Sequence, residues 1–285
     1  MDDKKAIIKE FGEKRLLLLR RYLRCAPLSR AIIRSREIEL LSNNRPSGRI
    51  LDLGHGDGIY AEVLAENGIS LFVGIDKSFS ELKLAQKRQK KNKNLTHLVV
   101  ADMEHLPFRD GAFGGAISNC VLEHIDNIEA SLLETLRTLI PGGKFATTVI
   151  TNRYEDLLFW PSFFRSLRLK GMANFYLKTI QQGFYHQRYL NVDEWSSLCK
   201  KVGFAVSDIQ AYAGIRRQSL MDICLPFVAC SKFLKHFVGR EVLLPVRWPA
   251  KKLNDFLAAD PSEEMIGESA NILLILQRPG VYTPR

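Results

Sequence analysis

Ile50-Leu-Asp-Leu-Gly-His-Gly-Asp-Gly58 is the stretch of sequence that decides the fold. An apolar strand leads directly into a glycine-rich turn, and the helical pattern of residues 60–67 follows at once. A backbone that turns tightly beneath a ligand needs positive φ angles and room that a Cβ would fill, which favours glycine. The amides that open the next helix add an electropositive group of hydrogen-bond donors. This stretch therefore predicts a ligand site at the end of a strand.

The next strand supplies the second part of that site. Residues 71–75 form an apolar run that ends in Asp76, and Asp52 lies inside the first strand just ahead of the glycines. An acidic residue about 20 positions beyond a glycine loop, at the end of the second strand, can hold both hydroxyls of a ribose. The spacing predicts a cofactor that contains adenosine.

Strands and helices alternate along most of the chain. We expect helices at 60–67, 80–91, 127–139 and 192–201, and strands at 49–53, 71–75, 96–100, 115–118, 144–150, 203–209 and 271–277. Single helices between the first five of these strands predict an α/β fold with a parallel, doubly wound sheet, and the alternation changes beyond residue 150. Ligands of such sheets lie at the carboxyl ends of the strands, where the glycine loop, Asp76, Asp102 and Asn119 all fall.

Additions flank this sheet. We expect an N-terminal helical segment at 1–47 and one large domain at 48–285, with an aromatic-rich cap segment at 151–190 and a helical insertion at 211–269. Within the insertion, 220–239 is apolar at helical spacing, is broken by Pro226 and has basic flanks. It is too short to span a bilayer. It fits either a lid over a substrate or a helix that lies in the membrane interface.

Composition narrows the class of protein only partly. The net charge is +10, with basic clusters in the N-terminal segment and at 83–93. Such a surplus favours acidic partners, among them nucleic acid and anionic lipid, but it also fits solvated helix faces. The cysteines are odd in number and lack metal-site spacing, so we expect reduced thiols, a cytoplasmic protein and no metal site; they are Cys25, Cys120, Cys199, Cys224 and Cys230.

Four motifs in order resemble the class I S-adenosylmethionine-dependent methyltransferases, most closely their type-11 branch. The first is Asp52-Leu-Gly-His-Gly-Asp-Gly58, followed by Ala101-Asp-Met-Glu-His-Leu-Pro-Phe-Arg-Asp110. The others are Ser118-Asn-Cys-Val-Leu-Glu-His-Ile125 and Leu136-Arg-Thr-Leu-Ile-Pro-Gly-Gly143. The resemblance implies a seven-stranded Rossmann-like methyltransferase fold and S-adenosylmethionine as cofactor. Two positions depart from the family pattern: His55 replaces a small residue, and Gly115 replaces an aspartate.

The resemblance also implies roles for single residues. Asp76 should hold the ribose, Asp102 the adenine amino group, and Asp52 the amino group of the methionine moiety. The full set expected to bind the cofactor is Asp52, Gly54, His55, Gly56, Gly58, Asp76, Lys77, Asp102, Met103, Asn119 and Cys120.

Methyl transfer asks chiefly for alignment of a nucleophile with the methyl group, and for a general base when the acceptor is a hydroxyl or amine. Histidine suits that task near neutral pH. The candidates are His124, after the fourth strand, and Tyr185 and His186 in the cap segment. Tyr185 and Arg188 are candidates for binding the acceptor, where Arg188 would pair with an acidic group.

We therefore expect methyl transfer to a small or lipid-like acceptor, at oxygen. The apolar insertion favours a bulky acceptor and allows peripheral contact with an anionic membrane. Two alternatives remain open: an RNA or protein methyltransferase, and a subunit that binds the cofactor without catalysing transfer. Nucleic acid is the less favoured partner, because Ser118-Asn-Cys-Val121 lacks the Asn/Asp-Pro-Pro-Tyr/Phe motif typical of amino-methylating enzymes of this fold.

Overall fold

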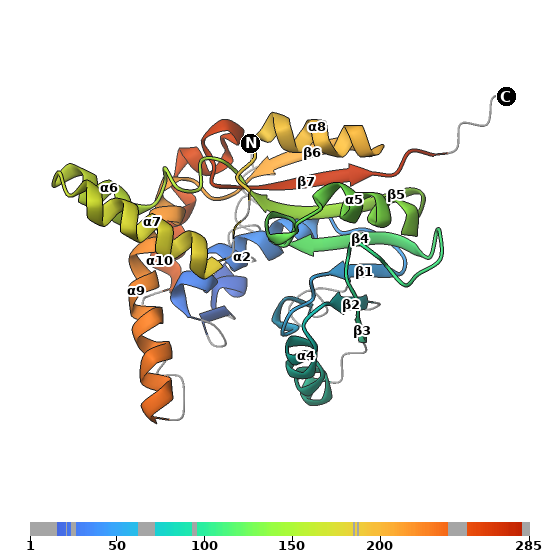
Figure 1. Cartoon of the computed structure of the whole chain (residues 1–285), viewed down its shortest axis with the longest axis horizontal. Helices are drawn as coiled ribbons and strands as arrows, with labels where there is room; N and C mark the ends of the chain where they lie inside the picture. Colours follow the sequence, from blue (N-terminus) through green and yellow to red (C-terminus); the bar gives the residue numbers. More distant parts are fainter. Residues whose placement is uncertain are drawn as a thin grey trace, which may run out of the picture. The chain divides into compact units, whose positions relative to one another are not determined.

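The computed structural model describes residues 16–20, 22–23, 27–61, 72–92, 96–184, 186, 188–238 and 250–280. Its core is a seven-stranded sheet with the order β3-β2-β1-β4-β5-β7-β6 (Figure 1). The strands are β1 (Ile50–Leu53), β2 (Phe72–Asp76), β3 (Thr96–Val100), β4 (Phe113–Asn119), β5 (Leu139–Ile150), β6 (Ala205–Ala211) and β7 (Asn271–Gln277). The chain thus has the predicted α/β methyltransferase-like fold.

The parallel arrangement holds for the first five strands but not for the whole sheet. β1 pairs with β2 and β4, β2 with β3, and β4 with β5, all in parallel register. β7 runs the other way: Gly142 N donates to Arg278 O, and Arg278 N donates back to Gly143 O, and its arrow opposes that of β4 (Figure 1). The predicted parallel arrangement is therefore confirmed for β1 to β5, and the sheet as a whole is mixed because β7 runs antiparallel.

Helices connect the strands much as the apolar periodicity predicts. α4 (Phe79–Asn92) packs on β2 and β3, and α5 (Ile128–Thr138) packs on α8 (Val192–Val202). Side-chain caps define two of these starts: Asn127 accepts from Ala130 N, and Asn191 forms a capping box with Glu194. The short helix η1 (Leu122–His124) follows β4. The expected helix at 60–67 is described only to residue 61, and residues 62–67 lie outside the described part of the chain.

The chain divides into two compact units. The sheet unit comprises 40–151, 185–210 and 272–285, and the helical unit comprises 1–39, 152–184 and 211–271. The core of the sheet unit combines strand residues such as Leu51, Ile75 and Phe145 with Trp195 of α8, whose indole nitrogen donates to Ile150 O.

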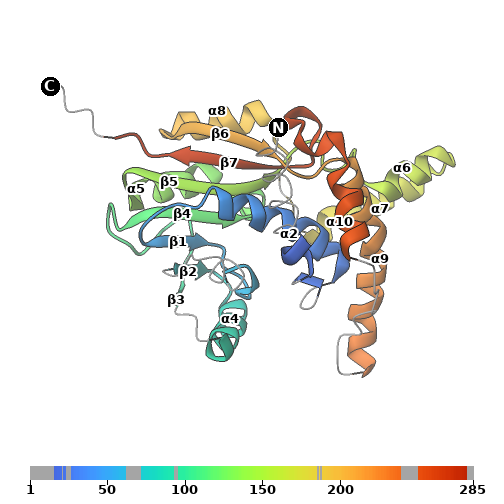
Figure 2. The same cartoon turned by 180° about the vertical axis from the view of Figure 1, so that it is seen from behind.

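The helical unit is made up of helices that the chain carries in addition to the sheet unit, labelled in Figure 2. It holds most of α2 (Leu28–Asn43), together with α6 (Phe159–Ser166), α7 (Lys170–Phe184), α9 (Ile215–Val238), α10 (Ala250–Ala258), η2 (Pro261–Glu264) and η3 (Ile266–Glu268). The helical insertion between the last two strands is therefore present. α9 runs through Pro226 as one helix, contrary to the expected break. Among the described residues, no helix is long and apolar enough to cross a membrane.

Candidate functional site

The glycine loop after β1 has the backbone conformation that its sequence predicts. Gly54, Gly56 and Gly58 all have positive φ angles, between +56° and +76°. A Cβ on Gly54 would lie 2.4 Å from the Val121 side chain, so this glycine lets the loop pack against the segment that follows β4. Among the residues that the structure describes, a Cβ on Gly56 would meet nothing within 4 Å. The loop therefore leaves open space beside Gly56.

Asp52 and His55 form a buried pair behind this loop. His55 Nδ1 lies 2.8 Å from Asp52 Oδ2, and both residues are at most 5% exposed. The imidazole also occupies the space beside Gly74, where a Cβ would lie 2.6 Å from the ring. The departure from the family pattern at His55 is thus matched by a glycine in β2. Its side chain packs behind the loop, and the expected contact between Asp52 and a cofactor stays a prediction.

Asp76 lies beside the glycine loop, as the spacing predicts. Gly56 N donates to Asp76 Oδ2 and Ser78 N donates to Asp76 Oδ1, both at 2.8 Å. Each carboxylate oxygen can still accept another hydrogen bond. The two amides therefore orient the carboxylate at the carboxyl end of β2, next to the open space at Gly56. Lys77 follows and is exposed.

The loop after β3 carries Asp102 and Met103. Asp102 is exposed, and its Oδ1 accepts from Glu104 N at 3.0 Å, while Met103 is buried in the core of the sheet unit. Asp102 is thus accessible to a ligand. The burial of Met103 leaves its predicted contact with an adenine ring untested.

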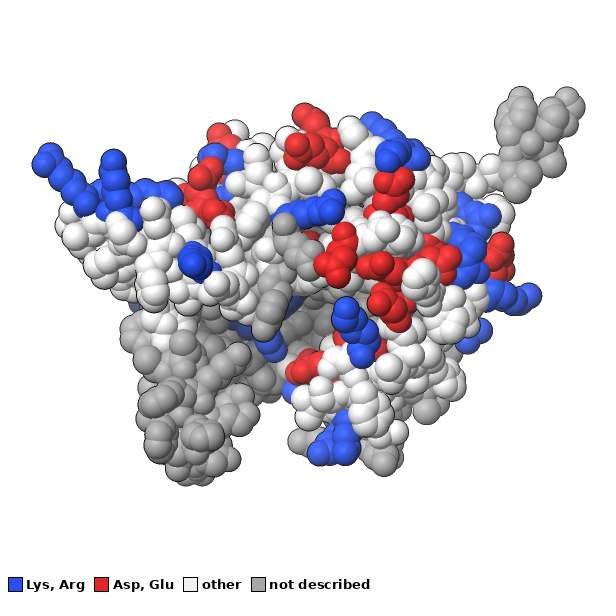
Figure 3. All heavy atoms as spheres, viewed as in Figure 1, with Lys and Arg blue, Asp and Glu red and all other residues white. Residues whose placement is uncertain are grey.

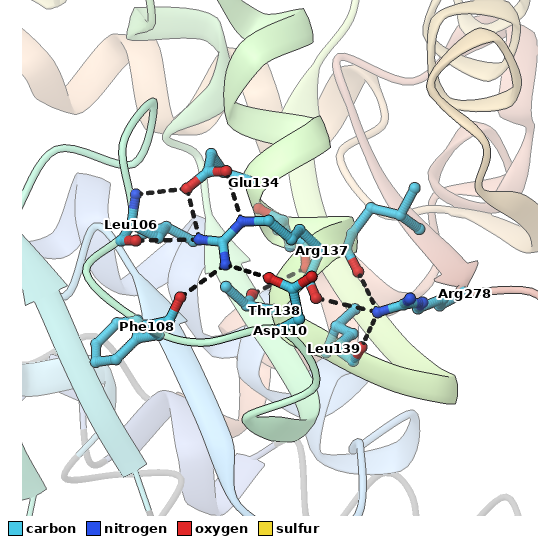
Figure 4. Close-up of polar contacts among 10 residues, drawn as sticks. Leu106, Phe108, Asp110, Glu134, Arg137, Thr138, Leu139 and Arg278 are labelled. Carbon is cyan, nitrogen blue, oxygen red and sulfur yellow. Dashed lines mark hydrogen bonds and ion pairs between the residues drawn. The ribbon is translucent and has the colours of Figure 1, made fainter.

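Arg137 of α5 holds the rest of this loop in place (Figure 4). Its guanidinium donates to Phe108 O at 2.7 Å, to Leu106 O at 3.1 Å and to Asp110 Oδ1 at 2.7 Å. It also pairs with Glu134, whose Oε2 accepts from Leu106 N at 2.8 Å. The bond from Arg137 lowers the pKa of the Glu134 carboxyl. This Arg137 clamp explains the family-like block at 102–110 as a loop fastened to α5.

A second arginine continues the network at the end of α5. Arg278, just after β7, donates to the carbonyl oxygens of Leu136, Arg137 and Leu139 (Figure 4). These carbonyls belong to the last turn of the helix or follow it, where they lack partners within the helix. Arg278 therefore joins β7 to the helix that carries the clamp.

Asn119 and Cys120 meet Thr148 of β5 at the end of β4. The Thr148 hydroxyl donates to Asn119 Oδ1 at 2.8 Å and accepts from Cys120 N at 3.0 Å. Cys120 has a φ of +50°, which is uncommon for a residue other than glycine. Strained residues of this kind concentrate at functional sites. The turn into η1 is thus held in an unfavourable backbone conformation by a fully buried threonine.

His124 and His186 are brought together from two distant parts of the chain. Their rings stack with centroids 5.2 Å apart and planes 26° from parallel, and His186 Nδ1 lies 3.2 Å from Tyr189 Oη. Burial, reinforced by the charge of His124, lowers the pKa of His186 to about 4. His186 is therefore neutral at pH 7.

Two further residues, Arg188 and Tyr185, were expected to bind the methyl acceptor. Arg188 is exposed and donates to Asp126 O at 3.4 Å, so its side chain lies against the turn that follows η1. Tyr185 lies outside the described residues. In the described part of the chain, no cluster of three or more His, Cys, Asp or Glu side chains could hold a metal ion.

Sequence reasoning missed several residues that shape this site. Thr148, Glu134 and Arg137 act through contacts between segments that are 28 or more positions apart, for which a single sequence gives no signal. Phe79 and Val100 are different, because both lie near a strand end at the predicted edge: Phe79 begins α4 three residues after β2 ends, and Val100 ends β3. They are 68% and 54% exposed, and large apolar side chains exposed beside Asp76 and Asp102 offer a surface for a flat ring.

Part of the chain matches known methyltransferases in sequence. Residues 51–147 match a protein family described as a methyltransferase domain. A demethylmenaquinone methyltransferase of Corynebacterium urealyticum is 33% identical over 101 residues, which is 35% of this chain and 41% of that protein. The 18S rRNA (guanine(1575)-N(7))-methyltransferase of Saccharomyces cerevisiae is 34% identical over 122 residues, or 39% and 42% of the two chains.

Solved structures extend the likeness in fold. The [4+2]-cyclase SpnF superposes with a TM-score of 0.59 at 18% identity, over 88% of this chain and 81% of that one. In sequence, the chain spans less than half the length of the two relatives named above. The stretch that matches the methyltransferase family, residues 51–147, runs from β1 into β5 and contains the glycine loop, Asp76, Asp102 and His124.

Proposed function

Residues 51–147 form a class I methyltransferase domain, and from this premise we propose that the protein transfers a methyl group from S-adenosylmethionine to a small or lipid-like, apolar acceptor. One observation carries the proposal. The open space at Gly56 lies beside an oriented carboxylate, Asp76, at the carboxyl end of the parallel strands. Ligands of open α/β sheets bind at that edge.

The residues at this edge fit the cofactor's chemistry. S-adenosylmethionine, when bound, supplies an electrophilic methyl group on a sulfonium. Asp76 would accept from the ribose hydroxyls, and Asp102 would accept from the adenine amino group. Phe79 and Val100 would offer apolar contact to the adenine ring, together with Lys77 and Met103. The loop from Gly54 to Gly58 would hold the methionine end, with Asp52 and the backbone of His55, Asn119 and Cys120.

The histidine pair supports an acceptor with a proton to lose, and oxygen is the atom we propose. His124 would take the proton from the acceptor hydroxyl, whose oxygen would form a bond to the methyl carbon as the methyl–sulfur bond breaks. His186 is a weak base because its pKa is about 4, so it stays neutral while His124 becomes charged. A neutral ring stacked on the imidazolium orients it without repelling it. His124 is therefore the proposed catalytic base and His186 a positioning residue.

The acceptor class rests on two observations. The helical unit contains an unusual density of aromatic side chains at Phe159, Trp160, Phe163, Phe164 and Tyr176. The Corynebacterium urealyticum relative acts on demethylmenaquinone, a quinone. An apolar ring compound with a hydroxyl is the acceptor that combines these observations with the histidine pair. Arg188, and Tyr185 beyond the described residues, stay candidates for contact with its polar groups.

Calorimetric titration tests the cofactor directly. We expect micromolar binding of S-adenosylmethionine and S-adenosylhomocysteine and none of NADH. Asp76→Ala should abolish binding and leave the circular dichroism spectrum unchanged. Normal binding by that variant would mean that Asp76 does not hold the ribose.

Screening with S-adenosylmethionine carrying a labelled methyl group then tests transfer. Aromatic hydroxyl compounds should accept label, and His124→Ala should lower kcat by about 100-fold or more at unchanged cofactor affinity. Binding without transfer to any acceptor would favour the catalytically silent alternative, because a fold does not by itself fix an activity.

RNA methylation is the second candidate, favoured by the rRNA-modifying relative and the net charge of +10. It predicts RNA binding that weakens steeply with salt, because phosphate contacts release counterions. Labelled RNA and labelled quinone-like acceptors can be compared in the same assay. Transfer to RNA alone would replace the apolar acceptor in the proposal.

A further inference from the structure

The hairpin formed by α6 and α7 exposes apolar side chains where its two helices meet. Five large ones are between 40% and 74% exposed: Phe163, Leu167, Leu169, Met172 and Phe175. Phe163 lies on α6 four positions before Leu167, the C-cap of that helix, and Met172 and Phe175 lie three apart on one face of α7. We call these five residues the hairpin tip. Clustered exposed apolar side chains mark contact surfaces.

The hairpin tip is rimmed by positive charge alone. Arg165, Arg168 and Lys170 are exposed between its apolar residues, and Lys and Arg side chains gather over the end of α6 in Figure 3. No Asp or Glu occurs in the sequence between Asp156 and Asp193. Residues 14–36 and 82–101 also lack acidic side chains, so the tip is distinguished by its exposed apolar residues together with the basic ones and not by the absence of acid alone.

The tip belongs to an ordered structure. Asp222 of α9 is fully buried, accepts from Trp160 N at 2.9 Å and accepts from the Tyr176 hydroxyl. These bonds fasten the start of α6 and the middle of α7 to α9. Trp160 and Phe164 pack on the inner side of the hairpin. The outer residues are therefore exposed although their helices are firmly held.

From this arrangement we propose that the hairpin tip inserts into the interface of an anionic lipid bilayer. Apolar side chains enter the boundary between head groups and acyl chains, and the basic rim pairs with lipid phosphates. The inference goes beyond methyl transfer and does not depend on it. It also assigns the membrane contact to α6 and α7, whereas the sequence had suggested the stretch at 220–239, whose side chains beyond residue 226 lie outside the described part.

Vesicle sedimentation of the full chain tests the proposal. Binding is expected to vesicles of phosphatidylcholine with phosphatidylglycerol, to be weaker at high salt, and to be slight with phosphatidylcholine alone. Arg168→Gln with Lys170→Gln should weaken binding about 30-fold, from the attraction of two basic side chains to an anionic surface. Leu167→Ser with Phe175→Ser should weaken it about tenfold or more, through lost apolar burial. All four side chains are exposed, so circular dichroism should show an unchanged fold.

A charge-matched control locates the effect. Lys83 and Lys87 are exposed on α4, and Lys83→Gln with Lys87→Gln removes the same charge. We expect this variant to bind vesicles within about threefold of the wild type. Equal losses in the two charge variants would overturn the proposal, because the attraction would then come from net charge. The proposal would also fail if the wild type did not bind vesicles but formed a dimer in solution, and if Leu167→Ser with Phe175→Ser dissociated that dimer. The hairpin tip would then be the contact surface for a second copy of the chain.

Discussion

At the scale of single residues, Gly56 gives the sharpest expectation. A Cβ there would meet no protein atom within 4 Å, but it would project into the space that the cofactor needs. Gly56→Ala should therefore cost only the strain of a positive φ, about 1–2 kcal/mol in unfolding free energy. Its affinity for S-adenosylhomocysteine should fall at least about 100-fold, which calorimetry would measure.

Gly142 provides the matched control for Gly56. It has a φ of +77° and, among the described residues, equally open space, but it lies in the Pro-Gly-Gly part of β5, where its amide donates to Arg278 O. Gly142→Ala should show a similar loss of stability and unchanged cofactor affinity. Equal affinities of the two variants for S-adenosylhomocysteine would show that the cofactor does not bind beside Gly56.

His186 predicts a dependence of stability on pH. Its pKa in the folded protein is about 4, below the ordinary 6.5, because burial disfavours the charged ring. The unfolded chain therefore takes up a proton between pH 6.5 and pH 4 that the folded chain excludes. The stabilisation is complete above pH 6.5 and is lost as the pH falls toward 4.

Denaturant unfolding between pH 4 and pH 7 measures this effect. His186→Gln should flatten the slope of unfolding free energy against pH across that window. Glu134 acts in a lower range, since its folded pKa lies below 4.5 and its stabilisation is lost as the pH falls below that value. A slope that the substitution leaves unchanged would show that His186 titrates normally in the folded protein.

At the scale of elements, the Arg137 clamp links a loop to a helix. Its bonds reach two backbone carbonyls and two carboxylates, and its side chain is about one-third exposed. Arg137→Ala should lower the unfolding free energy by about 2–3 kcal/mol, in line with bonds made by charged groups. It should also weaken cofactor binding, because the loop carries Asp102.

Two further variants serve as controls for Arg137→Ala. Arg137→Lys keeps the charge but not the geometry of the guanidinium, and Lys201→Ala breaks an ordinary surface ion pair. Lysine lacks the planar fork of donors, so Arg137→Lys should recover only part of the stability. Lys201 pairs with Glu129 on the surface, and both side chains are well exposed. Its replacement should cost less than about 1 kcal/mol. Equal losses at positions 137 and 201 would mean that the clamp contributes no more than a surface ion pair.

Elements with a strong local pattern were predictable. β3 and β7 have the expected bounds. α4, α5 and α8 each begin and end within one residue of the bounds expected for them. β5 begins earlier than expected, because Leu139 already pairs with Phe113 ahead of the Pro-Gly-Gly turn. Pro226 did not end α9, since one lost bond can be outweighed by the packing of a long helix.

The candidate site was predictable where it follows from sequence motifs. The glycine loop and Asp76 meet as their spacing implies. The contacts of Thr148, Glu134 and Arg137, and the stacking of His124 on His186, join segments that are distant in sequence. Such pairings depend on the topology of the whole sheet, and no local pattern encodes them. The reversed direction of β7 was missed for the same reason.

At the scale of the whole molecule, the two compact units divide the expected tasks. All described candidates for cofactor binding and proton transfer belong to the sheet unit. The aromatic cluster and the hairpin tip belong to the helical unit. Cofactor binding should thus stabilise one unit, while substitutions in the other should leave the cofactor's effect intact.

Heat unfolding with and without S-adenosylhomocysteine tests that division. A ligand at about 100 times its Kd adds about 2.7 kcal/mol, which raises the Tm of a domain of this size by roughly 5–10 °C. Tyr176→Phe removes the hydroxyl that donates to buried Asp222 and should lower stability by about 1–3 kcal/mol. This variant should keep the full ligand-induced shift, whereas Asp76→Ala should lose it. A ligand-induced shift abolished by Tyr176→Phe would show that cofactor binding requires the helical unit as well.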